Sequence, residues 1–320
     1  MGIGDILRSS AAWRALKDRW PGVELHLLFL SRHQGYPSEA LISQHHLLSS
    51  ATFLTIREGA PYDQTARKVP SLKIWKQVWQ ISRKIRPDLV IDFEWAGSRT
   101  SVVSLIARMA SGAQSLGIRQ FPFRGMFYTY TAASTSEFIQ KHGLSDPFDY
   151  TLRDFVALDA LDIERGKTPI ELKISAVATE WAANYLAVKP STLRVGLNIG
   201  CATIGAAHKR MPLDVLAVYF RSLMAQRDIH LIITGSKDEK DINEAFIKAL
   251  ADEGVNTSHV YNCAGQTDML TLAALIQSCG IFISTDSGPY HMAVALRKPT
   301  LCWLTSVSYT HLTLPTIYSV

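Results

Sequence analysis

Short apolar runs alternate along the chain with longer segments in which apolar residues recur every three or four positions. In the first half the apolar runs are 23–30 and 88–95, and the periodic segments are 5–20, 69–87 and 100–112. Short apolar runs are typical of buried strands, and the longer spacing is typical of amphipathic helices. The pattern predicts an α/β fold with a parallel sheet, whose strands are joined by crossover helices.

The second half repeats this alternation. Apolar runs that predict strands lie at 194–200, 230–236, 280–285 and 300–304, and periodic segments that predict helices lie at 176–187, 213–226, 240–251, 269–279 and 290–296. A chain of 320 residues is long for one domain and comfortable for two. We expect two doubly wound domains, an N-terminal one over residues 1–167 and a C-terminal one over residues 168–305.

Both ends of the sequence are expected to be clipped. The chain opens on a Gly-x-Gly turn and a helix, without the strand that normally feeds such a turn. Near the other end, the ten residues VSYTHLTLPT correspond to the translation of a sequencing-library adapter. We therefore expect residues 306–320 to be a non-native tail. The alternative is a genuine C-terminal strand and loop.

Composition narrows the class of protein. Hydrophobic residues make up 47% of the chain and charged residues 19%, which is typical of a globular protein and not of a disordered one. The net charge of +5 is dispersed, so it favours an anionic substrate or an anionic membrane surface over nucleic acid. No apolar run reaches the roughly 18 to 20 residues that span a bilayer, and the four separated cysteines fit a reducing, cytoplasmic setting.

The stretch Asp286-Ser287-Gly288-Pro289 lies between a predicted strand and a predicted helix. In doubly wound sheets, ligands bind at the carboxyl ends of strands, where helix N-termini offer unpaired N–H groups to phosphate. Ser287 can bond a phosphate oxygen, Gly288 lets the backbone approach closely, and Pro289 suits a first helical turn. The alternative is an ordinary helix cap by Asp286 or Ser287.

Two further loops follow predicted strands of the same sheet. Thr203 and Lys209 would supply a hydroxyl and a positive charge to a diphosphate, and Asp238 or Glu239 would accept hydrogen bonds from a ribose. Each loop alone has an ordinary interpretation, as a solvated lysine or as acidic residues at a helix start. Together the loops supply the partners of a nucleotide diphosphate.

Several of these motifs resemble those of glycosyltransferase family nine, the ADP-heptose:lipopolysaccharide heptosyltransferases. The resemblance rests on Lys-Arg-Met-Pro at 209–212, on 272–300 with its Asp-Ser-Gly-Pro-x-His signature, and on 2–25 and 85–113 in the first half. It implies a GT-B architecture, in which two Rossmann-like domains face a cleft and bind acceptor and nucleotide sugar respectively.

Site roles follow from the resemblance. Asp5 would be the catalytic base of an inverting transfer, and Lys209 with Thr203 would hold the leaving diphosphate together with Ser287 and Gly288. Asp286 and His291 match positions around the sugar and phosphate, and Glu239 matches a ribose contact. The resemblance implies a heptose moved from ADP-heptose to a lipopolysaccharide inner-core acceptor, without metal or cofactor, by a cytoplasmic enzyme that is peripheral on the inner face of the membrane.

Alternatives remain at this stage. A related GT-B transferase would use another nucleotide sugar, because Thr203-Ile204 stands where some relatives have two threonines. A non-catalytic nucleotide-binding protein or an inactive fragment is the other alternative. The triplet Asp92-Phe93-Glu94 suggests a metal-dependent transferase, but without a second ligand cluster it fits the polar wall of a cleft better. His45 and His46 lack a third ligand by spacing, and we expect them at the surface.

Overall fold

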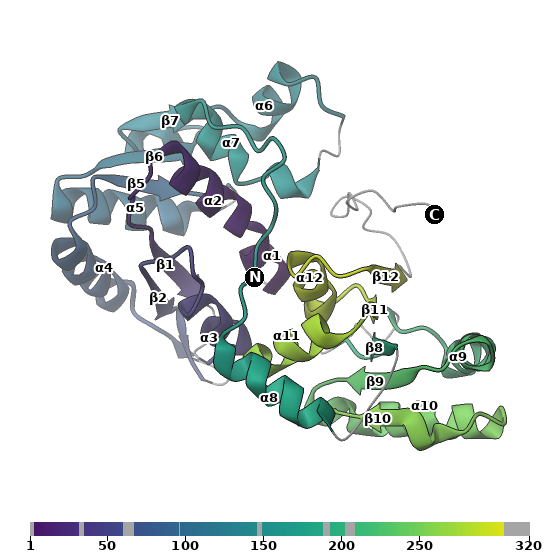
Figure 1. Cartoon of the computed structure of the whole chain (residues 1–320). Coiled ribbons are helices and arrows are strands. Elements are labelled where there is room, and N and C mark those ends of the chain that lie inside the picture. Colours follow the sequence, from purple (N-terminus) through teal and green to yellow (C-terminus); the bar gives the residue numbers. More distant parts are fainter. Residues whose placement is uncertain are drawn as a thin grey trace. The chain divides into compact units, whose positions relative to one another are not determined.

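The chain forms two compact units in a computed structural model, drawn in Figure 1. The structure describes residues 3–31, 35–59, 67–95, 97–145, 149–187, 193–201 and 209–303. The N-terminal unit contains the described residues of Arg8–Glu39 and His46–Thr168. The C-terminal unit contains those from Pro169 onwards together with two N-terminal segments, residues 3–7 and Ala40–His45. The main boundary between the units thus follows Thr168. Residues 3–7 and Ala40–His45 precede this boundary in the sequence but belong to the C-terminal unit.

A five-stranded parallel sheet forms the centre of the C-terminal unit, in the order β10-β9-β8-β11-β12. This order, with the first strand in the middle and the chain winding outwards in both directions, is that of a doubly wound fold. The strands are β8 (Arg194–Asn198), β9 (His230–Thr234), β10 (Val260–Asn262), β11 (Ile281–Thr285) and β12 (Thr300–Trp303).

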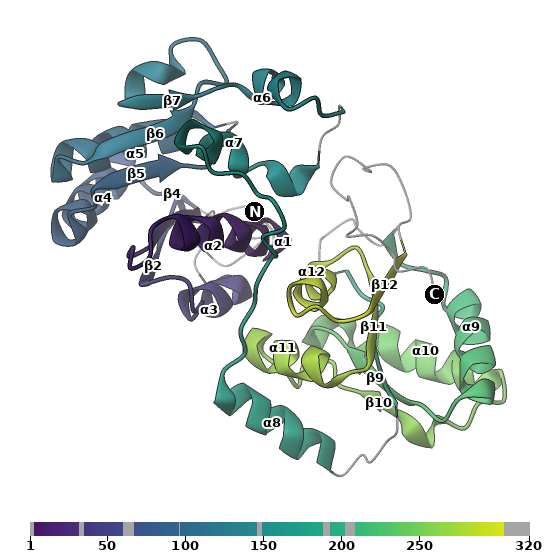
Figure 2. The ribbon, with the colours of Figure 1, turned by 45° about the horizontal axis from the view of Figure 1, so that its top comes forward.

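Helices cover both faces of this sheet (Figure 2). They are α8 (Ala176–Ala187), α9 (Leu213–Gln226), α10 (Lys240–Asp252), α11 (Met269–Ser278) and α12 (Gly288–Ala295). Side chains alternate between the faces of a strand, so Leu231 and Ile233 of β9 pack with Phe220 of α9 and Phe246 of α10. Ile232 points the other way, into a cluster with residues of α8 and α11.

The parallel strands of the N-terminal unit lie in two sheets, β1-β2 and β5-β6-β7, beside a two-stranded antiparallel pair, β3-β4. The strands are β1 (His26–Ser31), β2 (Ser50–Thr55), β3 (Arg57–Glu58), β4 (Arg67–Lys68), β5 (Leu89–Asp92), β6 (Gln114–Ile118) and β7 (Tyr130–Ala132). The helices of the first half are α1 (Ile3–Arg8), α2 (Ser10–Arg19), α3 (Pro37–Ser43), α4 (Ser71–Ile85), α5 (Ser98–Ser111), α6 (Thr135–Lys141) and α7 (Phe155–Leu158). The single parallel sheet expected here is therefore divided among the described residues.

One apolar cluster joins strands of both parallel sheets to the helices that cover them. Ile74 and Val78 of α4 and Ala107 of α5 pack with Leu54 of β2 and with Val90 of β5. The two helices are neighbours (Figure 1). The N-terminal unit is therefore held together by the inner faces of α4 and α5 as well as by strand pairing.

The predicted helix over 5–20 is present as α1 and α2, which only Ser9 separates. Ser9 itself has right-handed helical angles (φ −63°, ψ −15°), so the interruption is small. Gly112 ends α5 in the left-handed conformation, at φ 78°, as expected of a C-terminal cap. The strand expected before Gly2 stays a prediction, and the expected tail, residues 306–320, lies outside the described residues.

Candidate functional site

The Asp-Ser-Gly-Pro turn joins β11 to α12. Ser287 is extended and precedes Gly288, the first residue of the helix. The Ser287 hydroxyl lies 3.2 Å from both Asn198 Oδ1 and the carbonyl oxygen of Thr285, and it makes no cap to the helix. Ser287 therefore leaves the first-turn amides of α12 uncapped, at the positive end of the helix dipole. This arrangement suits an anion better than it suits a simple cap.

A lysine lies beside this turn. Lys209 Nζ donates to Asp286 Oδ2 at 2.9 Å, and His291 Nε2 lies 3.8 Å from Asp286 Oδ1. The hydrogen bond to Asp286 raises the pKa of Lys209, so the ammonium stays charged at neutral pH. The Lys209 carbonyl oxygen accepts a hydrogen bond from the Trp303 indole at 3.2 Å, which holds the backbone at Lys209. A half-exposed cation therefore lies next to the start of α12.

Glu239 is buried, with 6% of its surface exposed, where the chain leaves β9. Its Oε2 accepts from the Ser236 backbone N–H at 2.7 Å, whereas Oε1 has no hydrogen-bond partner among the described residues. A Cβ at Gly200, just beyond β8, would lie 1.9 Å from Oε1, so only glycine fits there. A buried acceptor without a partner is costly. Glu239 Oε1 is thus a buried acceptor beside Gly200 that has no partner among the described residues.

The segment that carries Asp5 packs on α12 within the C-terminal unit. A Cβ at Gly4 would lie 2.4 Å from the His291 ring, and a Cβ at Gly288 would lie 2.6 Å from the Ile3 side chain. Both glycines are therefore needed for the close approach of α1 to α12. Asp5, in the first turn of α1, is half-buried next to the residue that contacts His291.

The structure brings most of the predicted site residues to one edge of one unit. Thr203 lies outside the described residues. Two further residues with a role at this edge were missed: Asn198, which contacts Ser287, and Gly200, which makes room for Glu239. The available signal for Asn198 was a polar residue at the end of an otherwise apolar run.

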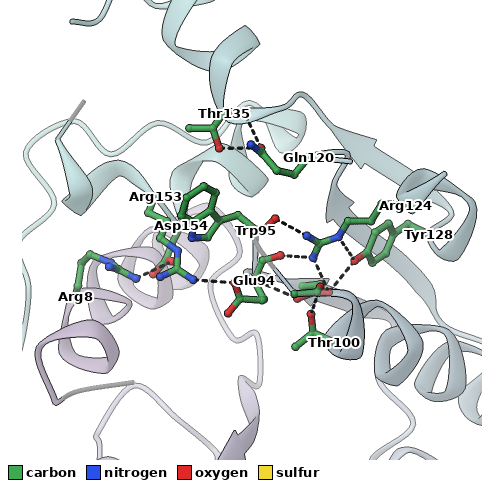
Figure 3. A network of polar contacts seen from close by, with 12 residues as sticks. Arg8, Glu94, Trp95, Thr100, Gln120, Arg124, Tyr128, Thr135, Arg153 and Asp154 are labelled. Atoms are coloured by element: carbon green, nitrogen blue, oxygen red, sulfur yellow. Dashed lines mark hydrogen bonds and ion pairs between the residues drawn. The ribbon is translucent and has the colours of Figure 1, made fainter. Parts of the chain in front are cut away.

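Asp92 and Glu94, the two acids of the triplet Asp92-Phe93-Glu94, belong to a network of polar contacts at the end of β5, in which Figure 3 labels Glu94, Arg124 and Tyr128. Tyr128 donates to Asp92 Oδ2 at 2.7 Å, the Glu94 backbone N–H donates to Oδ1 at 3.0 Å, and Arg124 lies 3.4 Å from Oδ2. Burial raises the pKa of Asp92, while these donors oppose the rise. The Asp92 oxygens are thus engaged by protein groups, and the carboxylate is part of the internal structure.

Of the two histidines expected at the surface, His46 is exposed and His45 is not. His45, expected at the surface, is buried, and its Nε2 lies 2.9 Å from the Glu171 carbonyl oxygen. Separately, the ligand atoms of Asp228, His230 and His259 lie within 4.8 Å of one another, around the amino end of β9. These residues are 31 positions apart at most in sequence, and spacing gave no signal of the cluster.

His230 gives the protein a predicted sensitivity to acid. Burial lowers the pKa of His230, as do the neighbouring charges of His259 and Arg194, and Asp228 opposes them. The unfolded chain then binds a proton more readily than the folded one, so the free energy of unfolding falls as the pH drops below about 6.5. Urea unfolding at pH 7.5 and at pH 5 is expected to show this loss, and to show less of it for His230→Gln. The control is His46→Gln at an exposed histidine, which is expected to lose as much stability as the wild type. If His230→Gln also loses as much as the wild type, His230 is not the source of the acid sensitivity.

Within the described residues, no helix is both long enough and apolar enough to cross a bilayer.

A known protein family matches the sequence from the middle of the chain onwards. Residues 130–311, more than half of the chain, match the sequence model of glycosyltransferase family 9 (heptosyltransferase). The chain belongs to this family.

Curated relatives are similar over part of their length. Lipooligosaccharide heptosyltransferase 2 of Haemophilus ducreyi is 35% identical over 92 residues, which are 28% of this chain and 26% of that protein. Lipooligosaccharide heptosyltransferase 2 of Campylobacter jejuni is 28% identical over 135 residues, which are 42% of this chain and 38% of that one. The matched regions thus span well under half of these relatives.

Solved structures share the fold over most of the chain. The E. coli ADP-heptose lps heptosyltransferase II superposes with a TM-score of 0.66 and 16% identity, over 100% of this chain and 89% of that one. A family 9 glycosyltransferase from Veillonella parvula gives a TM-score of 0.68 and 17% identity, over 94% of this chain and 77% of that one. The architecture is therefore GT-B, with two α/β units, as predicted.

Proposed function

We propose that the protein is an inverting glycosyltransferase that moves a heptose from ADP-heptose to an inner-core acceptor of lipopolysaccharide. The observation that carries the proposal is the Lys209–Asp286 pair at the uncapped start of α12. In this proposal the C-terminal domain, residues 168–305, binds the nucleotide sugar, and the N-terminal domain, residues 1–167, binds most of the acceptor. We further propose that the reaction takes place at the cytoplasmic face of the inner membrane, where a lipid-linked acceptor is accessible.

The leaving group is a nucleoside diphosphate, whose negative charge grows as the glycosidic bond breaks. Lys209 and the first-turn amides of α12, at Ser287 and Gly288, are fixed donors that stabilise this charge where it develops. Asp286 holds the ammonium at 2.9 Å and His291 lies on its other oxygen, so the cation is oriented before the substrate binds. These protein groups supply the positive charge that a metal ion supplies in other transferases, and we propose a metal-independent reaction.

Glu239 is proposed to bind the ribose of the nucleotide. Its Oε1 is buried and without a partner among the described residues, while Oε2 is held by the Ser236 backbone. A ribose hydroxyl donating to Oε1 would satisfy this oxygen and fix the nucleoside with respect to the turn. Thr203, outside the described residues, is proposed as a further diphosphate contact.

Asp5 is proposed as the catalytic base. The acceptor hydroxyl oxygen attacks the anomeric carbon from the side opposite the diphosphate, and the bond from that carbon to the phosphate oxygen breaks. Asp5 takes the proton of the hydroxyl as the new bond forms. Because the attack comes from the side opposite the leaving group, the configuration of the anomeric carbon is inverted, and ADP is released. A positioned base of this kind contributes roughly 10² to 10⁴ in rate.

Relatives of known name support an adenine nucleotide as the donor in this proposal. A solved E. coli heptosyltransferase that holds ADP-2-deoxy-2-fluoro heptose shares this fold, with a TM-score of 0.59 and 14% identity over 94% of this chain and 85% of that one. The relatives of Haemophilus ducreyi and Campylobacter jejuni carry the name lipooligosaccharide heptosyltransferase 2. The shared name of these two relatives concerns a heptose and a lipooligosaccharide, and the ligand of the solved structure is an ADP-linked heptose.

The test combines donor binding with product formation. Among ADP-, UDP- and GDP-linked sugars, ADP-heptose is expected to raise the melting temperature most, because a ligand that binds the folded state stabilises it. With a core acceptor that lacks the heptose, ADP is expected to be released. Glu239→Gln is expected to weaken ADP binding about tenfold, a loss of roughly 1.4 kcal/mol, whereas Glu244→Gln on the exposed face of α10 serves as the control.

The alternatives give different results. Preferential stabilisation by a UDP- or GDP-sugar would indicate a related transferase that uses another nucleotide sugar as its donor. Stabilisation without product, with every acceptor supplied, would favour a nucleotide-binding protein that does not catalyse transfer. Unchanged ADP affinity in Glu239→Gln would remove the ribose contact from the proposal.

A further inference from the structure

Helix α4 carries an apolar stripe on its outer face. Ile74 and Val78 on its inner face pack into the N-terminal unit, whereas Leu72 is 73% exposed and Trp75 and Trp79 are each 39% exposed. At about 100° per residue, the three exposed side chains lie within roughly 60° of one another around the helix. Two half-exposed tryptophans on one helix are uncommon for a surface that faces only water.

The same helix is basic throughout. Its sequence SLKIWKQVWQISRKI contains four basic residues and no acidic one. Lys76 and Arg83 are exposed and, by the helical spacing, lie along one edge of the stripe of Leu72, Trp75 and Trp79, within about 40° of Leu72. Lys73 is paired with Glu58 at 3.2 Å, so one of the four charges is partly neutralised within the protein. The apolar stripe thus has a positive border along one side.

We propose that the outer face of α4 docks the protein on an anionic lipid bilayer. Tryptophan side chains favour the level of the lipid headgroups, where the ring is partly dry and the indole N–H stays hydrated. Lysine and arginine near the surface add about 1 kcal/mol each of attraction to anionic lipid, which corresponds to about fivefold in binding. Charge complementarity favours this occupant over a second copy of the chain, whose α4 is equally basic.

Docking through α4 rests on the proposed function only in that the acceptor is lipid-linked. A helix that lies in the interface plane and stays folded on its own unit brings the enzyme to the lipid without spanning it. The inner face of α4 is already engaged with α5 and β2, so no rearrangement of the unit is needed.

The test is co-sedimentation of the whole protein with vesicles of phosphatidylethanolamine and phosphatidylglycerol, compared with neutral phosphatidylcholine vesicles. Binding is expected to the anionic vesicles and to fall with added salt. Trp75→Ser/Trp79→Ser is expected to lower the partition coefficient at least tenfold, and Lys76→Gln/Arg83→Gln by about tenfold or more. Val215→Ser/Tyr219→Ser on the exposed face of α9 is the matched control and is expected to bind as the wild type does.

Binding that is equal for neutral and anionic vesicles, or that is unchanged in both α4 variants, would overturn the proposal. Self-association through this face, seen as a dimer that the tryptophan variant abolishes while vesicle binding is absent, would overturn it as well. The variants are expected to melt as the wild type does, and a melting curve of each checks that it is folded. Turnover with a water-soluble acceptor is expected to stay unchanged in the α4 variants, so a failure of lipid docking is distinguishable from a failure of the transferase activity.

Discussion

Asp5→Asn is expected to lower kcat by roughly 10² to 10⁴ while leaving the affinity for the nucleotide sugar within a few fold of the wild type. Asparagine has nearly the shape of aspartate but does not accept a proton at neutral pH. The substitution changes neither the Gly4–His291 contact nor the Ile3–Gly288 contact, so both are expected to be kept. The measurement is ADP release with saturating acceptor, with donor binding followed in parallel by calorimetry.

The control for this prediction is Asp18→Asn, a substitution at an exposed carboxylate of α2. It is expected to leave kcat unchanged. Full turnover in Asp5→Asn would exclude Asp5 as the base while leaving the diphosphate site intact. Loss of donor binding in the same variant would indicate that Asp5 shapes the donor site instead.

Lys209→Met is expected to reduce kcat by about 10² to 10³, the range found when a fixed donor to a developing negative charge is removed. Methionine keeps much of the length and apolar stem of lysine but lacks the charge. The variant also leaves Asp286 without its 2.9 Å partner, and a bare carboxylate would repel the diphosphate. Steady-state kinetics and ADP affinity should be measured together, since both effects weaken the site.

A double variant separates the two effects. In Lys209→Met/Asp286→Asn the repulsion from Asp286 is removed, so ADP affinity is expected to recover partly while kcat stays low. Exposed Lys248→Met on α10 is the matched control and is expected to behave as the wild type. A wild-type kcat in Lys209→Met would show that Lys209 does not stabilise the leaving group.

Much of the C-terminal unit could be predicted from the sequence. Strands such as β8 and β9 are continuous apolar runs because both faces of a parallel sheet are covered by helices. Strand β10 was missed because Val260–Asn262 is three residues long, too short to produce a periodic signal. In the N-terminal unit the division of the parallel strands into two sheets depends on which edges pair, and an apolar run does not encode its neighbour.

The candidate site was predictable in composition and less so in geometry. The helix start at Gly288 and the charge of Lys209 are local features, so the sequence indicated both. The contact of Lys209 with Asp286 joins residues 77 positions apart, and spacing alone did not predict it. The burial of Glu239 depends on Gly200 having no side chain, and Gly200 lies 39 positions away, just beyond the end of β8.

The grouping of residues 3–7 with the C-terminal unit has a consequence for motion. Asp5 belongs to the same unit as Lys209 and Asp286, and the N-terminal unit begins three residues later, at Arg8. If the two units move relative to each other, the separation between the proposed base, Asp5, and the proposed diphosphate site at Lys209 is therefore expected to stay unchanged. The two proposed roles would then be filled by one preassembled unit, whatever the position of the other unit.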